Sequence, residues 1–323
     1  MTEPLLAVSD LRTYFTKKKG VTKAVDGISL TVYPSQVVCI VGESGSGKSL
    51  TALSILRLVP PPHGRIISGS IQFEGKDLLA LSEAQMTDVR GNDISMIFQE
   101  PMTALNPVLT VGQQLTEVLL RHRTIGKREA VAKSVEMLKL MGVPRAAEII
   151  HEYPHQLSGG LRQRVMTAMA MLCQPKLLIA DEPTTALDVT IQAQILQLMK
   201  AMRQEFNTSI ILITHDLGVV AEMADHVIVM YAGQIVESVE ADALFHRPDH
   251  PYTRALLASI PSLDKDQASL QSIPGTVPNA SAFPKGCRFA ARCEKATAEC
   301  SDQEIELEEK RPGHLVRCIK APH

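Results

Sequence analysis

The sequence predicts an α/β protein that carries a proline-rich, cysteine-bearing tail. From Leu5 to about Met230, short apolar runs alternate with helix-length segments, which is typical of an α/β domain. The continuous apolar runs suit strands buried on both faces, and they occupy residues 37–41, 177–180, 210–213 and 227–230. The helical candidates between them are residues 49–58, 161–173, 191–206 and 217–224.

Two segments depart from this alternation. Residues 111–141 read as helix with interruptions at Gly126 and Gly142, so we expect a helical insertion away from the sheet, in a subdomain of about residues 100–160. From about Phe245, prolines break the chain at positions 248, 251, 261, 274, 278 and 284. We therefore expect a domain of residues 1–245, followed by a tail of residues 246–323. The tail should have little regular structure before a compact cysteine-bearing module.

Composition excludes several classes of protein. The 323 residues are 45% hydrophobic, enough for a sizeable core, and the net charge of −2 disfavours nucleic acid as the main partner. The longest unbroken apolar run is six residues, whereas a membrane-spanning helix needs about 20. The first residues lack the basic and apolar regions of a secretory signal. We expect neither a membrane span nor a signal peptide.

The strongest motif follows the first apolar run. Residues 42–49 read G-E-S-G-S-G-K-S and fit the phosphate-binding pattern G-x-x-x-x-G-K-[ST], between a predicted strand and a predicted helix. Glycines let successive backbone N–H groups face one anion, and the helix presents its positive end to it. Lys48 would reach the β- and γ-phosphates and Ser49 would ligate Mg²⁺. The predicted nucleotide-binding residues here are Gly42, Ser44, Gly45, Ser46, Gly47, Lys48, Ser49 and Thr51.

A pair of carboxylates ends the apolar run at residues 177–180. Asp181 suits association with Mg²⁺, and Glu182 suits the general base that polarises the attacking water. A solvated acidic pair at a strand end is the alternative. Kinases, GTPases and ATPases share both pieces, so these residues alone do not choose between them.

Residues 157–163, which read L-S-G-G-L-R-Q, distinguish between these three classes of enzyme. Here the chain resembles the ATP-binding subunits of ABC transporters, whose signature is L-S-G-G-Q. Leu161 departs from the pattern, while Ser158, Gly159 and Gly160 are intact. The resemblance covers about residues 5–245. It implies an ABC-type P-loop ATPase domain with a mixed sheet core and a helical subdomain, in which the signature contacts the γ-phosphate of the ATP on the other subunit.

Further residues match that family in order. Gln99 resembles the Q-loop glutamine, which contacts Mg²⁺ or water and couples to the membrane subunits. Asp188 resembles the D-loop aspartate, and His215 resembles the switch histidine that contacts the γ-phosphate. Phe15 lies at the spacing of the aromatic residue that stacks on adenine, with Tyr14 as its neighbour. Either aromatic residue can instead belong to the core.

The tail narrows the family further. Residues 250–257, H-P-Y-T-R-A-L-L, and the cysteines after them resemble the oligopeptide/dipeptide importer subgroup, and Leu161 resembles one of its two paralogous ATPase subunits. The resemblance implies a head-to-tail ATPase heterodimer at the cytoplasmic face of the membrane, two separate permease subunits and an extracellular or periplasmic peptide-binding protein. Nickel importers are related, so nickel or another small solute is the alternative cargo.

Four cysteines cluster near the C-terminus in the pattern Cys287-x5-Cys293-x6-Cys300-x17-Cys318. A cytosolic chain should not hold stable disulfides, so metal binding is favoured. The spacing fits neither common zinc sites nor ferredoxins and leaves iron–sulfur, zinc and unligated thiols open. Resemblance to peptide-importer ATPases implies a [4Fe–4S] cluster. Arg288, Arg292 and Arg317 flank the thiols and would offset its negative charge, unless they are solvated.

Two other classes of function compete with a transporter. A soluble ABC-type protein of nucleic-acid repair or translation would usually carry two cassettes or a long coiled-coil insertion, whereas only 108 residues separate Ser49 from Ser158. A regulator that binds ATP without hydrolysing it would not need Glu182 or His215. The sequence therefore favours an ATPase that powers peptide import, with ATP and Mg²⁺ as its cofactors.

Overall fold

The computed structural model describes residues 3–17, 20–99, 104–185, 188–259 and 273–322. The chain forms two compact units. The first unit contains residues 1–32, 37–79 and 213–323, and the second contains residues 33–36 and 80–212. Among the described helices, none has the length and apolar character needed to cross a membrane.

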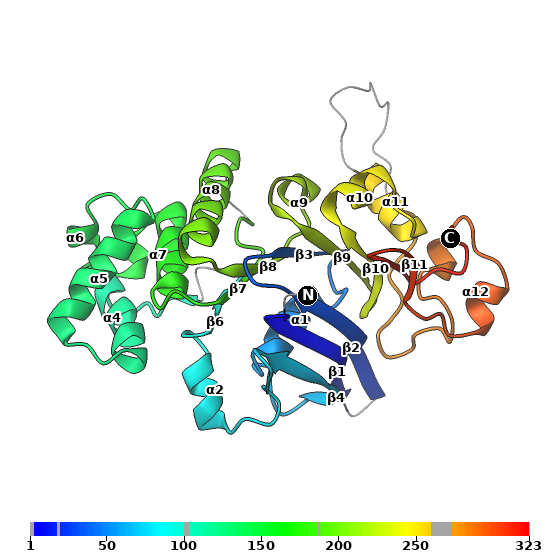
Figure 1. Ribbon diagram of the computed structural model, residues 1–323, viewed down its shortest axis with the longest axis horizontal. Coiled ribbons are helices and arrows are strands. Elements are labelled where there is room, and N and C mark those ends of the chain that lie inside the picture. The colour runs from blue at the N-terminus through cyan, green and yellow to red at the C-terminus, as the bar shows by residue number, and fades with distance from the viewer. Residues whose placement is uncertain (1–2, 18–19, 100–103, 186–187, 260–272, 323) are drawn as a thin grey trace. The chain divides into compact units, whose positions relative to one another are not determined.

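An antiparallel sheet in the first unit was not among the predicted elements. Its strands lie in the order β2-β1-β4-β5, of which Figure 1 labels β2, β1 and β4. Leu6, Leu11, Ile28 and Ile71 are fully buried on it. Because these apolar residues alternate with polar ones, the sheet has one buried face and gives no continuous apolar run. The strands are β1 (Leu6–Lys17), β2 (Gly20–Val32), β4 (Gly64–Phe73) and β5 (Lys76–Asp77).

The first unit also contains a mixed sheet with the order β11-β12-β10-β9-β3. The predicted strand β3 (Val37–Val41) is buried at every residue and pairs in parallel with β9 (His226–Tyr231). β10 (Gln234–Glu240) is antiparallel to β9. Helices α1 (Lys48–Ile55) and α9 (Leu217–Met223) follow the predicted helical segments within three residues at each end.

The tail has more regular structure than the sequence predicts. Helices α10 (Ala241–His246) and α11 (Pro251–Ala258) precede the cysteines. Pro251 stands in the first turn of α11, where a proline needs no N–H partner, so it starts this helix instead of breaking it. β12 (His314–Val316) pairs with β10 and with β11 (Glu308–Arg311), so the end of the tail extends the mixed sheet. The cysteine-bearing part contains two short helices, η2 (Ala290–Arg292) and α12 (Glu299–Asp302).

The second unit contains the two remaining predicted strands, one strand that was not predicted (residues 94–97) and the helical insertion. β7 (Leu177–Asp181) lies between β8 (Ser209–Ile213) and β6 (Ile94–Ile97), and β6 and β7 are parallel. The insertion divides near Gly126, as expected, into α4 (Val111–His122) and α5 (Lys127–Leu140), which lie with α6 (Ala146–Ile149) beyond α7 (Gly159–Met171) in Figure 1. The other helices of this unit are α2 (Glu83–Val89), η1 (Pro154–Gln156) and α8 (Val189–Phe206).

Candidate nucleotide-binding site

The loop between β3 and α1 requires glycine at its two ends. Gly42 has a φ of 148° and Gly47 a φ of 104°, both in the region that side chains rarely adopt. A Cβ on Gly42 would lie 2.1 Å from the Met230 oxygen, and one on Gly47 would lie 2.5 Å from the Ala24 oxygen. The backbones of strands β9 and β2 therefore pack directly against the loop and stabilise its curved conformation.

Lys48 closes this loop from inside. Its Nζ donates to the carbonyl oxygens of Gly42 (2.8 Å) and Glu43 (3.1 Å), and the residue is 6% exposed. The Ser46 hydroxyl is buried and has no hydrogen-bond partner among the described residues. A buried orphan hydroxyl inside a ring of glycines is a group that a phosphate oxygen can satisfy. Thr51 is fully buried, and its hydroxyl donates a hydrogen bond to the Gly47 oxygen (2.9 Å) at the N-terminal end of α1.

The carboxylate pair lies in the second unit. Asp181 ends β7 and is buried. Glu182 follows it with a φ of 47°, an uncommon conformation for a residue with a side chain. Its Oε2 accepts hydrogen bonds from Gln99 Nε2 (3.0 Å) and from Thr185 Oγ1 (2.9 Å). The structure thus brings Gln99 and Glu182 together from the ends of neighbouring strands β6 and β7.

The signature and D-loop residues begin two helices of the second unit. Ser158 caps α7, where its Oγ accepts from Leu161 N (3.4 Å), and Gly159 and Gly160 form the first turn. Asp188 caps α8, where its Oδ1 accepts from Ile191 N (2.9 Å). Residues 186 and 187 of the D-loop and residues 100–103 after Gln99 lie outside the described part of the chain.

The remaining predicted nucleotide contacts belong to the first unit. His215 follows β8 and is exposed. Phe15 is half-buried at the end of β1, next to Gly64: a Cβ on that glycine would lie 2.8 Å from Phe15 Cε1. The Tyr14 hydroxyl donates to Asp26 Oδ1 (2.5 Å). Since neighbouring strand residues face opposite sides, Phe15 points away from this hydrogen bond.

All four tail cysteines, Cys287, Cys293, Cys300 and Cys318, line one cavity of about 20 Å³. Burial raises the pKa of Cys287 to about 11 and raises the pKa of Cys293 and Cys318. No disulfide joins these thiols. Within the described ranges, no group of three or more histidine, cysteine or acidic residues is arranged to hold a metal ion. The thiols are gathered, but they are not arranged as a closed metal site.

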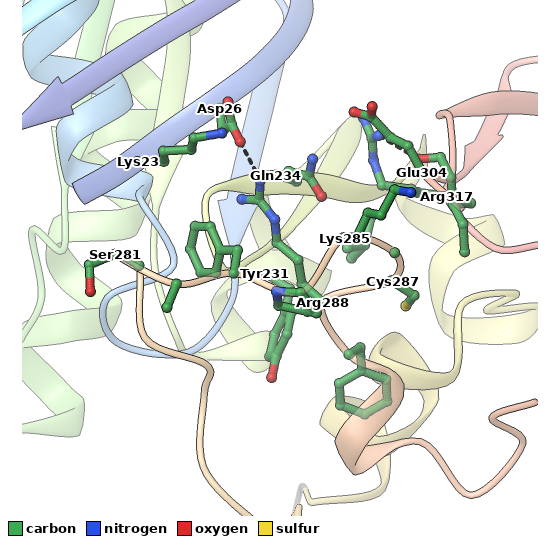
Figure 2. Close-up of a pocket in the computed structure, with 18 of the residues that line it drawn as sticks. Lys23, Asp26, Tyr231, Gln234, Ser281, Lys285, Cys287, Arg288, Glu304 and Arg317 are labelled. Carbon is green, nitrogen blue, oxygen red and sulfur yellow. Dashed lines mark hydrogen bonds and ion pairs between the residues drawn. The ribbon is translucent and has the colours of Figure 1, made fainter. Parts of the chain in front are cut away.

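The side chains of two of the three arginines beside these thiols are buried, and all three arginines bond to other residues of the protein, which contradicts the alternative that they are solvated. The side chains of Arg288 and Arg292 are 8% and 4% exposed. Arg288 reaches Asp26 on β2 and the Ala232 oxygen, as Figure 2 shows for the carboxylate. Arg317 donates to the oxygens of Ile235 (2.9 Å) and Ile305 (2.7 Å). These arginines attach the tail to the sheets of the first unit.

The group that anchors the tail to β10 was not among the residues predicted from the sequence. Glu237 is fully buried and accepts from the backbone N–H groups of Asp249 (2.7 Å) and His250 (3.0 Å), and it lies 2.7 Å from His314 Nε2. Burial alone would raise the pKa of Glu237, but the bond with His314 and these N–H groups lower it. A glutamate within the apolar stretch of β10 was the signal available in the sequence.

Two family models match this chain. The model described as "ABC transporter" covers residues 25–185, and the one described as "Oligopeptide/dipeptide transporter, C-terminal region" covers residues 236–300. The first match lies within the region that resembles ABC ATPases, and most of the second match lies in the tail that resembles peptide importers.

Two curated proteins of Bacillus subtilis (strain 168) are similar over nearly the whole chain. The oligopeptide transport ATP-binding protein AppD is 56% identical over 98% of this chain and 96% of its own length. The dipeptide transport ATP-binding protein DppD is 50% identical over 98% of this chain and 94% of its own length. A solved dimer of the ATP-binding cassette MJ0796 bound to ADP and Pi has a TM-score of 0.66 at 25% identity, covering 73% of this chain and 98% of that one.

Proposed function

Because this chain belongs to the family of ATP-binding subunits of oligopeptide and dipeptide ABC transporters, we propose that it hydrolyses ATP to power the import of peptides through separate membrane subunits. The predicted family and the ABC ATPase fold are confirmed. The observation that carries the proposal is the 56% identity to an oligopeptide transport protein over 98% of the chain, tail included.

Nucleotide binding in this proposal uses the loop at residues 42–49. Lys48 would exchange its carbonyl acceptors at Gly42 and Glu43 for the β- and γ-phosphate oxygens, and the buried Ser46 hydroxyl would gain an acceptor. Phe15 would stack on the adenine. Mg²⁺, which neutralises phosphate charge in this chemistry, would be held by Ser49, Gln99 and Asp181.

Hydrolysis requires a base and a group that senses the γ-phosphate. Glu182 would orient the attacking water and accept its proton, and Gln99, hydrogen-bonded to the same carboxylate, would position that water. His215 would contact the γ-phosphate. In a second subunit, the helix start at Ser158, Gly159 and Gly160 would complete the site, and Asp188 would lie beside it.

We further propose which partners this subunit needs. The dimeric state of the MJ0796 cassette with ADP and Pi supports a pair of ATPase subunits, and the resemblance to ABC transporters implies that the pair is head-to-tail. The departure at Leu161 favours a paralogous ATPase as the partner, in place of a second copy. Two permeases and an extracellular or periplasmic peptide-binding protein would complete the importer, with this subunit on the cytoplasmic face. The insertion of α4–α6 is the surface proposed to dock on the permeases.

The tail thiols are proposed to hold a [4Fe–4S] cluster. Their convergence on one cavity supports this assignment, since four cysteines form the ligand set of such a cluster. The fit is incomplete, because a cavity of about 20 Å³ has room for about one water molecule. The thiols would have to move apart to accept a cluster. Iron content decides this assignment, and no step of ATP hydrolysis depends on it.

Uptake by the complete transporter tests the function. Vesicles that carry this subunit with its permeases and binding protein should accumulate a labelled peptide only when MgATP is supplied. Lys48→Ala should remove uptake, whereas Lys76→Ala, at an exposed lysine of β5, should not. Uptake that persists in Lys48→Ala would contradict the proposal. Uptake of nickel in place of peptide would support the alternative cargo.

A further inference from the structure

Glu43, the second residue of the phosphate-binding loop, is paired with an arginine of the tail. Arg292 Nη1 donates to Glu43 Oε2 (2.6 Å) and Nη2 donates to Glu43 Oε1 (2.9 Å). The pair is bidentate, the strongest geometry for an arginine–carboxylate contact. The Arg292 side chain is 4% exposed and that of Glu43 is 26% exposed, so water screens the contact only in part.

The backbone of Glu43 is also bound by a residue of the tail. Its N–H donates to the hydroxyl of Tyr252 on α11 (2.8 Å). The Tyr252 ring packs on Tyr231 (ring centroids 4.7 Å apart) and on Phe289 (5.4 Å), and Arg292 Nη1 also donates to the Tyr231 hydroxyl (3.2 Å). The side chain and the N–H of one loop residue are therefore both fixed by residues that follow the loop by more than 180 positions.

Arg292 is itself positioned by the thiol-bearing part of the tail. It ends the short helix η2 and directly precedes Cys293. Its Nε donates to the Pro274 oxygen (2.8 Å) and its Nη2 to the Ile273 oxygen (3.2 Å). The guanidinium is a rigid fork, so these bonds to the tail fix the direction in which it meets Glu43.

We propose that Arg292 is a positioning residue for ATP: it fixes Glu43 so that the loop at residues 42–49 keeps its phosphate-binding conformation before nucleotide arrives. This inference rests on the proposed role of that loop in ATP binding. Arg292 also offsets the negative charge of a carboxylate that belongs to the loop proposed to bind a polyanion. The tail therefore contributes to ATP affinity, and, by reciprocity, bound ATP stabilises the tail.

The steady-state kinetics of the assembled transporter test this role. Arg292→Ala should raise the KM for MgATP about tenfold, equivalent to about 1.4 kcal/mol, while kcat stays within about twofold. Arg292→Lys keeps the charge but loses the fork, and should recover part of the affinity. Arg288→Ala is the matched control: it removes an equally buried arginine of the same module, which pairs with Asp26 (Figure 2) instead of the loop.

A double-mutant cycle keeps the test decisive if Arg292→Ala perturbs folding. Glu43→Gln alone should raise the KM severalfold, and Glu43→Gln combined with Arg292→Ala should be no worse than Arg292→Ala alone. Additive effects, or an equal rise in KM for Arg288→Ala, would overturn the inference. Lys48→Ala, measured in parallel, separates the two claims. If it weakens ATP binding and Arg292→Ala does not, only the positioning role fails; if it has no effect, the proposed nucleotide site fails.

Discussion

Replacing Glu182 with glutamine separates the basicity of this side chain from its hydrogen bonds. In the structure a single oxygen, Oε2, accepts from both Gln99 Nε2 (3.0 Å) and Thr185 Oγ1 (2.9 Å). The amide oxygen of a glutamine can accept the same two bonds, and the shape of the side chain is unchanged. We therefore expect a loss of folding stability below about 1 kcal/mol, the value of one ordinary hydrogen bond.

The effect on catalysis should be much larger. Losing a general base typically lowers the rate about 10²- to 10⁴-fold, which corresponds to about 3 to 5 kcal/mol in the activation barrier. Phosphate release by the reconstituted transporter at saturating MgATP measures the rate, and retention of labelled ATP measures binding. The variant should bind ATP as well as the wild type does. Turnover within a few fold of wild type would refute the role of Glu182 as the base.

Three other outcomes are expected. Protein purified without oxygen should contain about four irons per chain if the thiols hold one cluster, and Cys300→Ser should remove them without abolishing ATP binding; zinc or no metal would refute the assignment. The isolated chain should hydrolyse ATP slowly until the paralogous ATPase and permeases are added, and full activity of a demonstrated monomer would contradict the composite site. Burial lowers the pKa of His250 to about 4, whereas the ordinary pKa of a histidine is about 6.5. Below about pH 6.5 the unfolded chain therefore binds a proton at His250 more readily than the folded chain does. Lowering the pH from 7 to 5 should then reduce the free energy of unfolding by about 2 kcal/mol. Thermal unfolding should show this loss, and His250→Asn, which can still cap α11 but does not titrate, should remove it.

Burial on both faces made the central strands predictable. β3, β7 and β8 are buried at every residue, so each gives a continuous apolar run. The strands of the antiparallel sheet, β1, β2, β4 and β5, gave no such run. The pairing of β1 with β2 also has register shifts between Val8 and Leu11 and between Thr13 and Tyr14, so the alternation of apolar and polar residues changes phase along β1.

The nucleotide loop was predictable because its chemistry is local. Glycines, a lysine and a serine must lie within eight positions to surround one phosphate chain. The pairing of Glu43 with Arg292 spans 249 positions and follows from how the tail folds back. The proline count also misled the prediction for the tail, since Pro251 supports the first turn of α11 and β12 joins the sheet through the backbone.

Three of the four tail thiols directly adjoin an arginine that attaches the tail, and this adjacency connects the thiols to the nucleotide loop. All four thiols line one cavity, and the arginine beside each of three thiols bonds to a residue outside the tail: Arg288 to Asp26, Arg292 to Glu43 and Arg317 to the Ile235 oxygen. Each arginine is one peptide bond from its cysteine. We therefore expect that a displacement of Cys293, by metal loading or oxidation, also shifts Arg292, and that ATP affinity changes with it because Arg292 holds Glu43.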